Sequence, residues 1–210
     1  MILKKLVVGP YDTNSYIFGS STTKEVVIID PGGNSNKIIH SIKDIDAKTI
    51  SILLTHTHFD HTGAVDRIKQ EFNIPVLFNK KECELGMHYQ KEADDWLDEG
   101  DTISIGEITL NVLETPGHSP GSLSFFSSDI KEYKGREIDG IIFTGDLIFQ
   151  RGLGSAYVDG GDPDDLFSSL SEKIIQNPNF SDNYLIFPGH MGEFLIGDKR
   201  RLGMFQTRMY

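Results

Sequence analysis

Short apolar runs recur along the chain, and most of them are rich in β-branched residues. EVVIID (25–30), TISILLT (49–55) and GIIFTGD (140–146) are typical of strands buried on both faces, because their apolar residues are consecutive rather than alternating. Polar or glycine-containing segments separate these runs from one another. The pattern predicts strands over residues 2–8, 15–19, 25–30, 49–55, 75–78, 107–115, 122–126, 140–146 and 184–190.

Helical patterns lie between some of these runs. Segments 34–44 and 63–72 each carry an apolar stripe at helical spacing, and segment 162–175 adds an acidic first turn that suits a helix N-terminus. Segments 80–101 and 127–140 show neither period, and we expect irregular surface structure there. Strands mixed with helices predict an α/β protein in which helices cover sheets.

Composition narrows the class of protein. The 210 residues are ordinary for one globular domain, and we treat 1–210 as a single domain. The net charge of −11 disfavours a nucleic-acid partner, and no apolar run approaches the length of a membrane span. With one cysteine, Cys83, and no secretory leader pattern at the N-terminus, we expect a cytoplasmic location. Nothing in the composition indicates an oligomeric state.

The most informative stretch is THTHFDHTG (55–63), which follows a predicted buried strand. It places His56, His58, Asp60 and His61 within six positions, although the chain has only seven histidines. Imidazole and carboxylate groups are ligands that suit zinc, iron and manganese. In an extended stretch the first two histidines point to the same side, and the turn into a helix near Thr62 aims the other two groups at a neighbouring point. This spacing predicts two adjacent metal ions.

Three further candidate ligands lie where predicted strands end in glycine-containing turns. His118 follows 107–115 in the turn Pro-Gly-His, Asp146 follows Gly145, and His190 ends YLIFPGH. Glycine lets the backbone pass close to a site without a side chain in the way. A glycine followed by a histidine or an aspartate is a weak signal when it occurs alone. Together with the first motif, the three such pairs predict one metal centre.

These residues resemble the metallo-β-lactamase-fold hydrolases, and most closely the short relatives of glyoxalase II, the hydroxyacylglutathione hydrolases. The resemblance covers nearly the whole chain, and its motifs run in family order. It implies an αββα sandwich with the metals at one edge of the paired sheets. The matching segments are THTHFDHTG (55–63), TPGHSPGS (115–122), FTGD (143–146), GGD (160–162) and FPGH (187–190).

The resemblance also implies a ligand assignment and a substrate. Two ions, zinc first with iron or manganese as alternatives, would be held at two sites bridged by Asp146. The small-molecule substrate would be a thioester of the acylglutathione class. The implied ligands of metal one are His56, His58 and His118, and those of metal two are Asp60, His61 and His190.

Departures from the family pattern affect the substrate rather than the metals. Ser155 and Tyr157 stand where short glyoxalase II relatives usually have an arginine and an aspartate. Only twenty residues follow His190, so we expect no C-terminal helical glutathione-binding domain. Tyr157 and Arg200 remain weak candidates for substrate contacts. His88 is expected in a local cluster, with a substrate-facing lid as the alternative.

The chemistry expected of this constellation is hydrolysis. Two metals about 3.5–4 Å apart can share a hydroxide that attacks a carbonyl, so no serine or cysteine nucleophile is required. Asp60 would orient the proton of this nucleophile. A thiol leaves readily because its pKa is only about 8.5, which favours a thioester over an amide. Cys83 is not at a strand end, which counts against a β-lactamase whose second zinc uses cysteine.

Other functions of the same residues stay open. A persulfide dioxygenase would use one Fe(II) at His56, His118 and Asp146. Hydrolysis of a lactone or a phosphodiester would use the same two metals. A non-catalytic metal-binding module would keep the constellation and turn over nothing.

Overall fold

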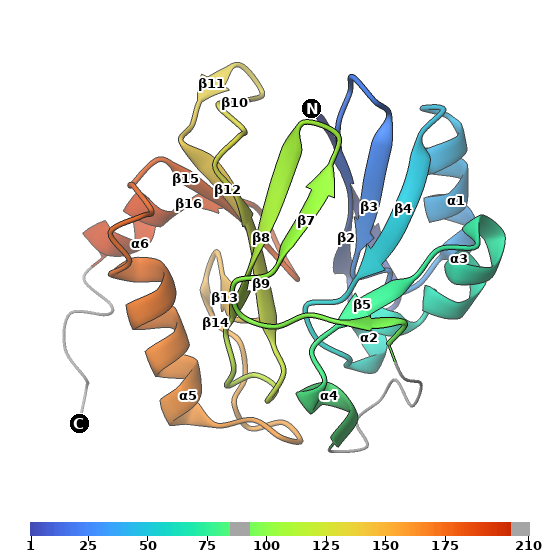
Figure 1. The fold of residues 1–210 in the computed structure, drawn as a ribbon. Helices are drawn as coiled ribbons and strands as arrows, with labels where there is room; N and C mark the ends of the chain where they lie inside the picture. The colour runs from blue at the N-terminus through green and yellow to red at the C-terminus, as the bar shows by residue number, and fades with distance from the viewer. Residues whose placement is uncertain (85–92, 203–210) are drawn as a thin grey trace.

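The computed structural model describes residues 1–84 and 93–202. Two six-stranded sheets lie face to face, and helices cover the outer face of each (Figure 1). The layers therefore run helix, sheet, sheet, helix, and the predicted αββα sandwich is confirmed. None of the helices formed by the described residues is long and apolar enough to cross a membrane.

The first sheet comes from the N-terminal half of the chain, in the order β1-β2-β3-β4-β5-β6. The first three strands pair antiparallel, and the later pairs are parallel. The strands are β1 (Ile2–Val8), β2 (Thr13–Gly19), β3 (Glu25–Ile29), β4 (Lys48–Leu53), β5 (Val76–Phe78) and β6 (Asp95–Trp96).

The second sheet has the order β16-β15-β12-β9-β8-β7, and only β12 and β15 pair parallel. Its strands are β7 (Thr102–Ile105), β8 (Ile108–Glu114), β9 (Leu123–Ser127), β12 (Gly140–Gly145), β15 (Tyr184–Pro188) and β16 (Phe194–Leu195). Two small hairpins extend from it. They are formed by β10 (Glu132–Tyr133) with β11 (Arg136–Glu137) and by β13 (Ile148–Phe149) with β14 (Gly152–Leu153).

Helices pack on both outer faces. α1 (Ser35–Lys43) and α3 (Val65–Phe72) cover the first sheet. α5 (Pro163–Ser168), its continuation as the π-helix η1 (Ser169–Ile175), and α6 (Ile196–Arg201) cover the second. Two short helices, α2 (Phe59–Thr62) and α4 (Lys81–Glu84), lie near one end of the first sheet (Figure 1).

The apolar runs form strands because each sheet is buried on both faces. In β3, Val27 and Ile29 pack into the core between the sheets, whereas Val26 and Ile28 pack beneath the helices. In β12, Phe143 packs into the core between the sheets, and Ile142 packs beneath the helices that cover the second sheet. Consecutive apolar residues are therefore what this layered fold requires.

All the predicted strands form, but the two segments predicted as irregular contain short elements. Segment 127–140 holds the β10–β11 hairpin, in which Glu132 pairs with Glu137. Segment 80–101 holds α4 and β6, while His88 and its neighbours lie outside the described residues. Elements of two to four residues are too short to show a period, so the pattern could not reveal them. The helix predicted to start near Thr62 forms as α3 from Val65, and a separate short helix, α2, precedes it over Phe59–Thr62.

The strand directions bring several strand ends to one edge of the sandwich. β3 runs parallel to β4, β12 runs parallel to β15, and β8 runs in the same direction as β12 because β9 lies antiparallel to both. Their carboxyl ends therefore lie at the same edge of each sheet. This edge carries every candidate ligand found in the sequence.

Glu193 connects the outer strands of the two sheets. Its carboxylate accepts a hydrogen bond from Lys5 on β1 at 3.2 Å and one from Lys134, after β10, at 2.9 Å. Burial alone would raise the pKa of Glu193, but Lys134 and Lys5 lower it from 4.5 to about 2.

The first prediction is that Glu193→Gln lowers the free energy of unfolding at pH 7 by about 1 kcal/mol, in the range of partly exposed ion pairs. Because the pKa of Glu193 is lower in the native state than in the unfolded state, its contribution to the free energy of unfolding is fully present above about pH 4.5. This contribution is lost as the pH falls toward 2. Chemical denaturation of both proteins at several pH values checks this. Glu172→Gln, at an exposed position of η1, is the control. A difference that stays constant from pH 7 to pH 3 would contradict the prediction.

Candidate metal centre

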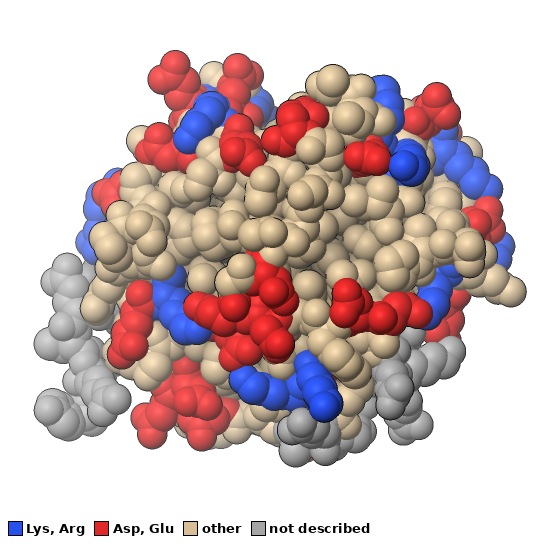
Figure 2. Space-filling view, in the orientation of Figure 1, with Lys and Arg blue, Asp and Glu red and all other residues tan. Residues whose placement is uncertain are grey.

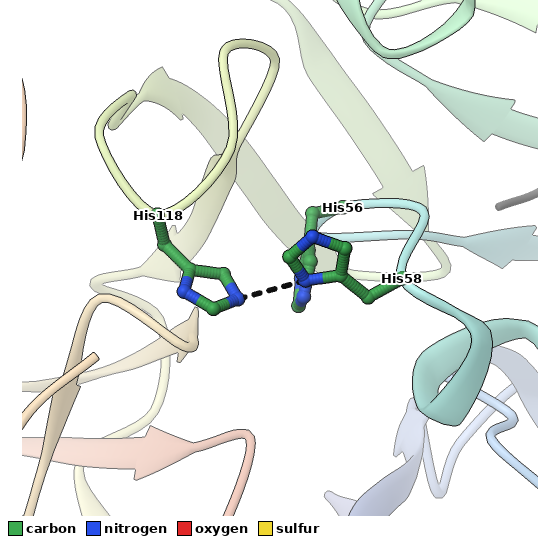
Figure 3. Close-up of side chains that lie close together, drawn as sticks. All are labelled: His56, His58 and His118. Carbon is green, nitrogen blue, oxygen red and sulfur yellow. Dashed lines mark hydrogen bonds between the residues drawn. The ribbon is translucent and has the colours of Figure 1, made fainter. Parts of the chain in front are cut away.

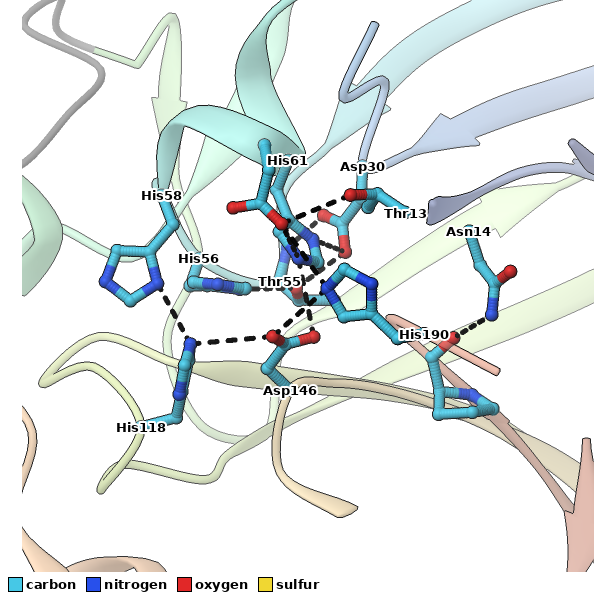
Figure 4. Close-up of polar contacts among 12 residues, drawn as sticks. Thr13, Asn14, Asp30, Thr55, His56, His58, His61, His118, Asp146 and His190 are labelled. Carbon is cyan, nitrogen blue, oxygen red and sulfur yellow. Dashed lines mark hydrogen bonds and ion pairs between the residues drawn. The ribbon is translucent and has the colours of Figure 1, made fainter. Parts of the chain in front are cut away.

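The seven predicted ligands converge at the edge where the strands end, although they come from four separate segments. Two sheets supply them, so neither sheet alone holds the whole set (Figure 4). The side chains are His56, His58, Asp60 and His61 after β4, His118 after β8, Asp146 after β12, and His190 after β15.

His56, His58 and His118 form the first set, with one nitrogen of each within 4.8 Å of the others (Figure 3). His58 Nδ1 lies 2.9 Å from His118 Nε2. All three side chains are buried, with at most 8% of their surface exposed. Three ring nitrogens that point at one another in a buried position make an arrangement suited to a cation.

Asp60, His61 and His190 form the second set within the same limit of 4.8 Å. His190 Nε2 lies 3.3 Å from Asp60 Oδ2, and His61 Nε2 lies 3.6 Å from the same oxygen. Two imidazoles and a carboxylate are again a donor set for zinc, iron or manganese.

Asp146 lies between the two sets (Figure 4). Its Oδ1 is 3.4 Å from His61 Nε2, and its Oδ2 is 3.4 Å from His190 Nε2 and 3.7 Å from His118 Nε2. Together with His56 and His61 it also satisfies the distance limit for a shared ion. One carboxylate therefore faces members of both sets, which is the position required of a bridging ligand.

The protein holds the outward nitrogen of each of four histidines. His61 Nδ1 lies 3.0 Å from Asp30 Oδ2, and His56 Nδ1 lies 3.0 Å from the Thr55 hydroxyl, which itself donates to Asp30. His118 Nδ1 lies 2.7 Å from a backbone oxygen, that of Ser155. His190 Nδ1 lies 3.1 Å from the backbone oxygen of Tyr11. Such outer acceptors fix the tautomer that leaves Nε2 free to bind a metal.

Three atoms that face the centre have no hydrogen-bond partner within the described residues. They are His56 Nε2, His61 Nε2 and Asp146 Oδ1, and all three are buried. Buried polar atoms are normally paired, because leaving one unpaired costs about 1–3 kcal/mol. A cation bound among them would satisfy all three at once, so the donor set fits a metal centre.

The charges of these groups are strongly coupled. Burial alone would raise the pKa of Asp146, but the neighbouring His61 and the hydrogen bond with His190 hold it well below its usual range. Burial lowers the pKa of His56, and the nearby His61 and His118 lower it further. For His190, burial lowers the pKa, but the Asp146 and Asp60 carboxylates raise it to about 9.

His61 and Asp60 complete this electrostatic pattern. Burial lowers the pKa of His61, yet the Asp146 and Asp30 carboxylates raise it well above its usual value. Burial raises the pKa of Asp60, but His190 and His61 together bring it below its ordinary value. The carboxylates therefore stabilise positive charge at this edge of the molecule.

Gly189 shows how closely the backbone approaches the centre. A Cβ atom at this position would lie 2.1 Å from Asp146 Oδ1 and 2.8 Å from His61 Cε1. Any side chain there would push the central carboxylate out of place. The glycine before His190 is therefore a requirement of the site, as its place in the sequence indicated.

A pocket of about 400 Å³ opens onto the centre. One wall is apolar: Tyr11 and Phe59 stack edge to face with ring centroids 5.0 Å apart, although each exposes at least half of its surface. The full lining is Tyr11, His58, Phe59, Asp60, His118, Asp146, Val158 and Asp159.

The two weak candidates for substrate contacts lie outside this lining. Tyr157 is 91% exposed, and it is the residues after it that line the pocket. Arg200 lies elsewhere, because its guanidinium donates to Asp182 and to the backbone oxygens of Ile175 and Phe180. Arg200 therefore joins α6 to the end of η1 rather than reaching the centre.

The residues that support the ligands were not apparent from the sequence. Asp30 and Thr55 hold two of the histidines, and Thr13 donates to Asp60 Oδ2 at 3.2 Å. Asn14 donates from its side chain to the backbone oxygens of Pro188 and Met191, on either side of His190. Asp30 ends a predicted strand, and that position was a signal that could have found it.

Comparisons with known proteins agree with the fold. The chain matches the metallo-beta-lactamase superfamily model over residues 8–190. It is 33% identical over 201 residues to the probable metallo-hydrolase YqgX of Bacillus subtilis (strain 168), which covers 89% of each chain. It is 30% identical over 197 residues to the hydroxyacylglutathione hydrolase GloC of Haemophilus influenzae, which covers 87% of each.

Solved structures give the same answer. The BLEG-1 B3 metallo-beta-lactamase superposes with a TM-score of 0.83 at 32% identity, over 98% of this chain and all of that chain. TTHA1623 in a di-iron-bound form superposes with a TM-score of 0.79 at 27% identity, over 94% of this chain and 97% of that chain. The chain therefore belongs to the metallo-beta-lactamase superfamily.

Proposed function

We propose that the protein is a dinuclear metal-dependent hydrolase that acts on thioesters. The observation that carries this proposal is the pair of adjacent ligand sets that share Asp146 at the floor of a pocket. Each set offers three donors from fixed positions, and an apolar wall stands beside them.

The proposed ligands follow the two sets. His56, His58 and His118 would hold metal one, Asp60, His61 and His190 would hold metal two, and Asp146 would bridge them. When bound, the two ions would supply a hydroxide at neutral pH and an electrophile for the carbonyl oxygen. Zinc is the proposed metal, with iron as the alternative that the di-iron form of TTHA1623 supports.

The protein's own groups orient the reactants. Thr13 donates to Asp60 Oδ2, and this carboxylate lines the pocket, which supports the proposal that Asp60 would orient the proton of the nucleophile. Tyr11, Phe59 and Val158 would pack against the apolar part of the substrate and exclude water from one side.

Two arguments favour a thioester as the substrate. A thiol with a pKa of about 8.5 leaves without a strong acid, whereas an amide nitrogen needs a proton from the enzyme. The relative GloC is named a hydroxyacylglutathione hydrolase, and such a substrate is a thioester. The reaction would release a carboxylic acid and a thiol.

The charged side chains that line the pocket bear on which thiol forms the thioester. Three aspartates and no lysine or arginine occur among the described residues that line it. The face viewed in Figure 2 shows acidic side chains gathered below its centre, in keeping with the net charge of −11. Bound cations would offset the charges of Asp60 and Asp146, so Asp159 is the one aspartate of the described lining that lies outside both ligand sets. Glutathione carries a net negative charge, and no lysine or arginine of the described lining could pair with its carboxylates, so this lining favours a neutral thioester.

A second candidate is β-lactam hydrolysis, because BLEG-1, a B3 metallo-beta-lactamase, superposes on this protein over the whole of the BLEG-1 chain. The bond broken would be an amide, and its nitrogen leaves as an amine that must be protonated. A chromogenic cephalosporin belongs in the same assay panel for this reason.

The second prediction concerns metal content. The wild type should bind two metal ions per chain, His190→Ala should lose mainly the second, and Asp146→Ala should lose metal at both sites and abolish turnover. Both variants should also melt at lower temperature, because bound metal stabilises the native state. Elemental analysis and thermal unfolding of metal-replete protein measure these effects.

His40→Ala is the matched control, since His40 is an exposed histidine on α1 that lies outside both sets. It should leave the metal content unchanged. If Asp146→Ala keeps two tightly bound metals and near-normal activity, the bridging role is wrong. One iron per chain in the wild type would instead favour a persulfide dioxygenase.

The third prediction concerns the thioester. Metal-loaded enzyme should release thiol slowly from S-lactoylglutathione, with a high KM. A neutral carrier such as N-acetylcysteamine, bearing the same acyl group, should give a kcat/KM at least about tenfold higher, which corresponds to about 1.4 kcal/mol. Thiol release followed with a disulfide dye measures both.

Asp159→Asn tests the charge argument, because Asp159 lies in the lining but outside both ligand sets. It should lower the KM for the glutathione thioester and leave that for the neutral one unchanged. Thiol release from neither carrier would overturn the thioester assignment. Metal binding without turnover of any thioester, lactone, β-lactam or persulfide would indicate a binding module.

A further inference from the structure

Glu82 is a fully buried carboxylate on α4, and it contacts both loops that carry the first set of histidines. We propose that Glu82 is a positioning residue that holds these two loops in register, so that the histidines of metal one meet at one point. The inference rests on the proposed metal centre and names a residue outside its ligands.

One oxygen of Glu82 binds the loop after β4. Oε2 accepts the backbone N–H of Thr57 at 2.8 Å and its hydroxyl at 2.9 Å. Thr57 lies between His56 and His58, and all of these side chains are buried. Because the backbone of Thr57 is fixed by Glu82, the direction of the two flanking histidines is fixed with it.

The other oxygen binds the loop after β8. Oε1 accepts the hydroxyl of Ser119 at 2.6 Å and the backbone N–H of Gly121 at 2.8 Å. Ser119 follows His118 directly and is also buried. The loop that supplies the third histidine is therefore attached to the same carboxylate as the loop that supplies the first two.

The absence of a side chain at position 121 permits this approach. A Cβ on Gly121 would lie 2.8 Å from Glu82 Cγ and 2.9 Å from its Oε1. The glycine that follows the TPGHSP segment is thus explained by the space that Glu82 occupies rather than by the metal ligands themselves.

The helix that carries Glu82 is itself fixed at its start by Asn79. Asn79 precedes α4, and its side-chain oxygen accepts the backbone N–H of Lys81 at 3.0 Å while its side-chain N–H donates to the Leu97 backbone oxygen at 2.8 Å. Asn79 is 1% exposed. Asn79 therefore joins the start of α4 to the segment that follows β6.

Four donors converge on Glu82, and a carboxylate is the side chain that can accept from all of them. Glutamine keeps the shape but replaces one oxygen with a donor, which would face either the pair from Thr57 or the pair from Ser119 and Gly121. Two of the donors are backbone N–H groups that cannot turn away. Glu82→Gln must therefore release one of the two loops while the side chain still fills its place.

The test is a cobalt titration of Glu82→Gln, followed by the visible absorption of the bound ion. The wild type should take up two ions. In the variant, one of the two should bind roughly ten- to a hundredfold more weakly, the range typical of groups that orient metal ligands, and its absorption bands should shift. Metal-free variant should still unfold cooperatively, because the change conserves volume.

Glu107→Gln is the matched control, since Glu107 also accepts from two hydroxyls, those of Ser20 and Thr22, but belongs to the β7–β8 turn. It should keep the wild-type titration and spectrum. Ser119→Ala and Thr57→Val, which each remove one hydroxyl donor, should weaken the same ion by a smaller factor, and they apply if Glu82→Gln does not fold.

The outcomes separate the two proposals. A wild type that binds no cobalt overturns the metal centre, and the role of Glu82 falls with it. Two ions in the wild type, with an unchanged affinity and spectrum in Glu82→Gln or in both hydroxyl variants, overturn the role of Glu82 alone. Equal weakening of both ions, with the spectral shape preserved, would also contradict it, because the contacts of Glu82 reach only the first set.

Discussion

Burial of both faces of both sheets is the constraint on which the rest of the structure depends. Val27 and Ile29 pack between the sheets while Val26 and Ile28 pack beneath the helices, so β3 has no face for a polar group. In β12, Phe143 likewise packs between the sheets while Ile142 packs beneath the helices. Polar side chains that must act together can therefore gather only where the strands end, and parallel strand directions bring those ends to one edge.

That edge is buried as well, so its polar groups need partners. Asp30 serves the Thr55 backbone, the Thr55 hydroxyl and His61, and Glu82 serves the loops around Thr57 and Ser119. These two carboxylates lie on the far side of the ligands from the metal centre, and they accept hydrogen bonds from N–H and hydroxyl groups of the segments that carry the ligands. Within residues 1–84 and 93–202, the polar atoms at the centre that have no hydrogen-bond partner are those that face one another, which is the arrangement expected of a site built for cations.

The residues that could bind metal and those that could recognise a substrate occupy different parts of the pocket. Its floor carries the metal-ligand side chains, whereas Tyr11, Phe59 and Val158 supply an apolar wall that contributes no ligand. Members of one superfamily can therefore share a floor and differ at the wall. For this chain Asp159, together with the absence of lysine and arginine from the described lining, weighs against an anionic thiol carrier, which is why the thioester proposal is joined to a neutral one.

The sequence by itself determined the strands that have long apolar runs, the layered α/β class and the seven candidate metal ligands. Apolar runs are local, and His56, His118, Asp146 and His190 each follow a run that predicts a strand. The tertiary structure alone decided what lies behind the ligands. Glu82 meets residues 25 to 39 positions away, and a contact of this kind leaves no period in the sequence. A local pattern reports which face of an element is buried, but only packing decides which buried donor meets which acceptor.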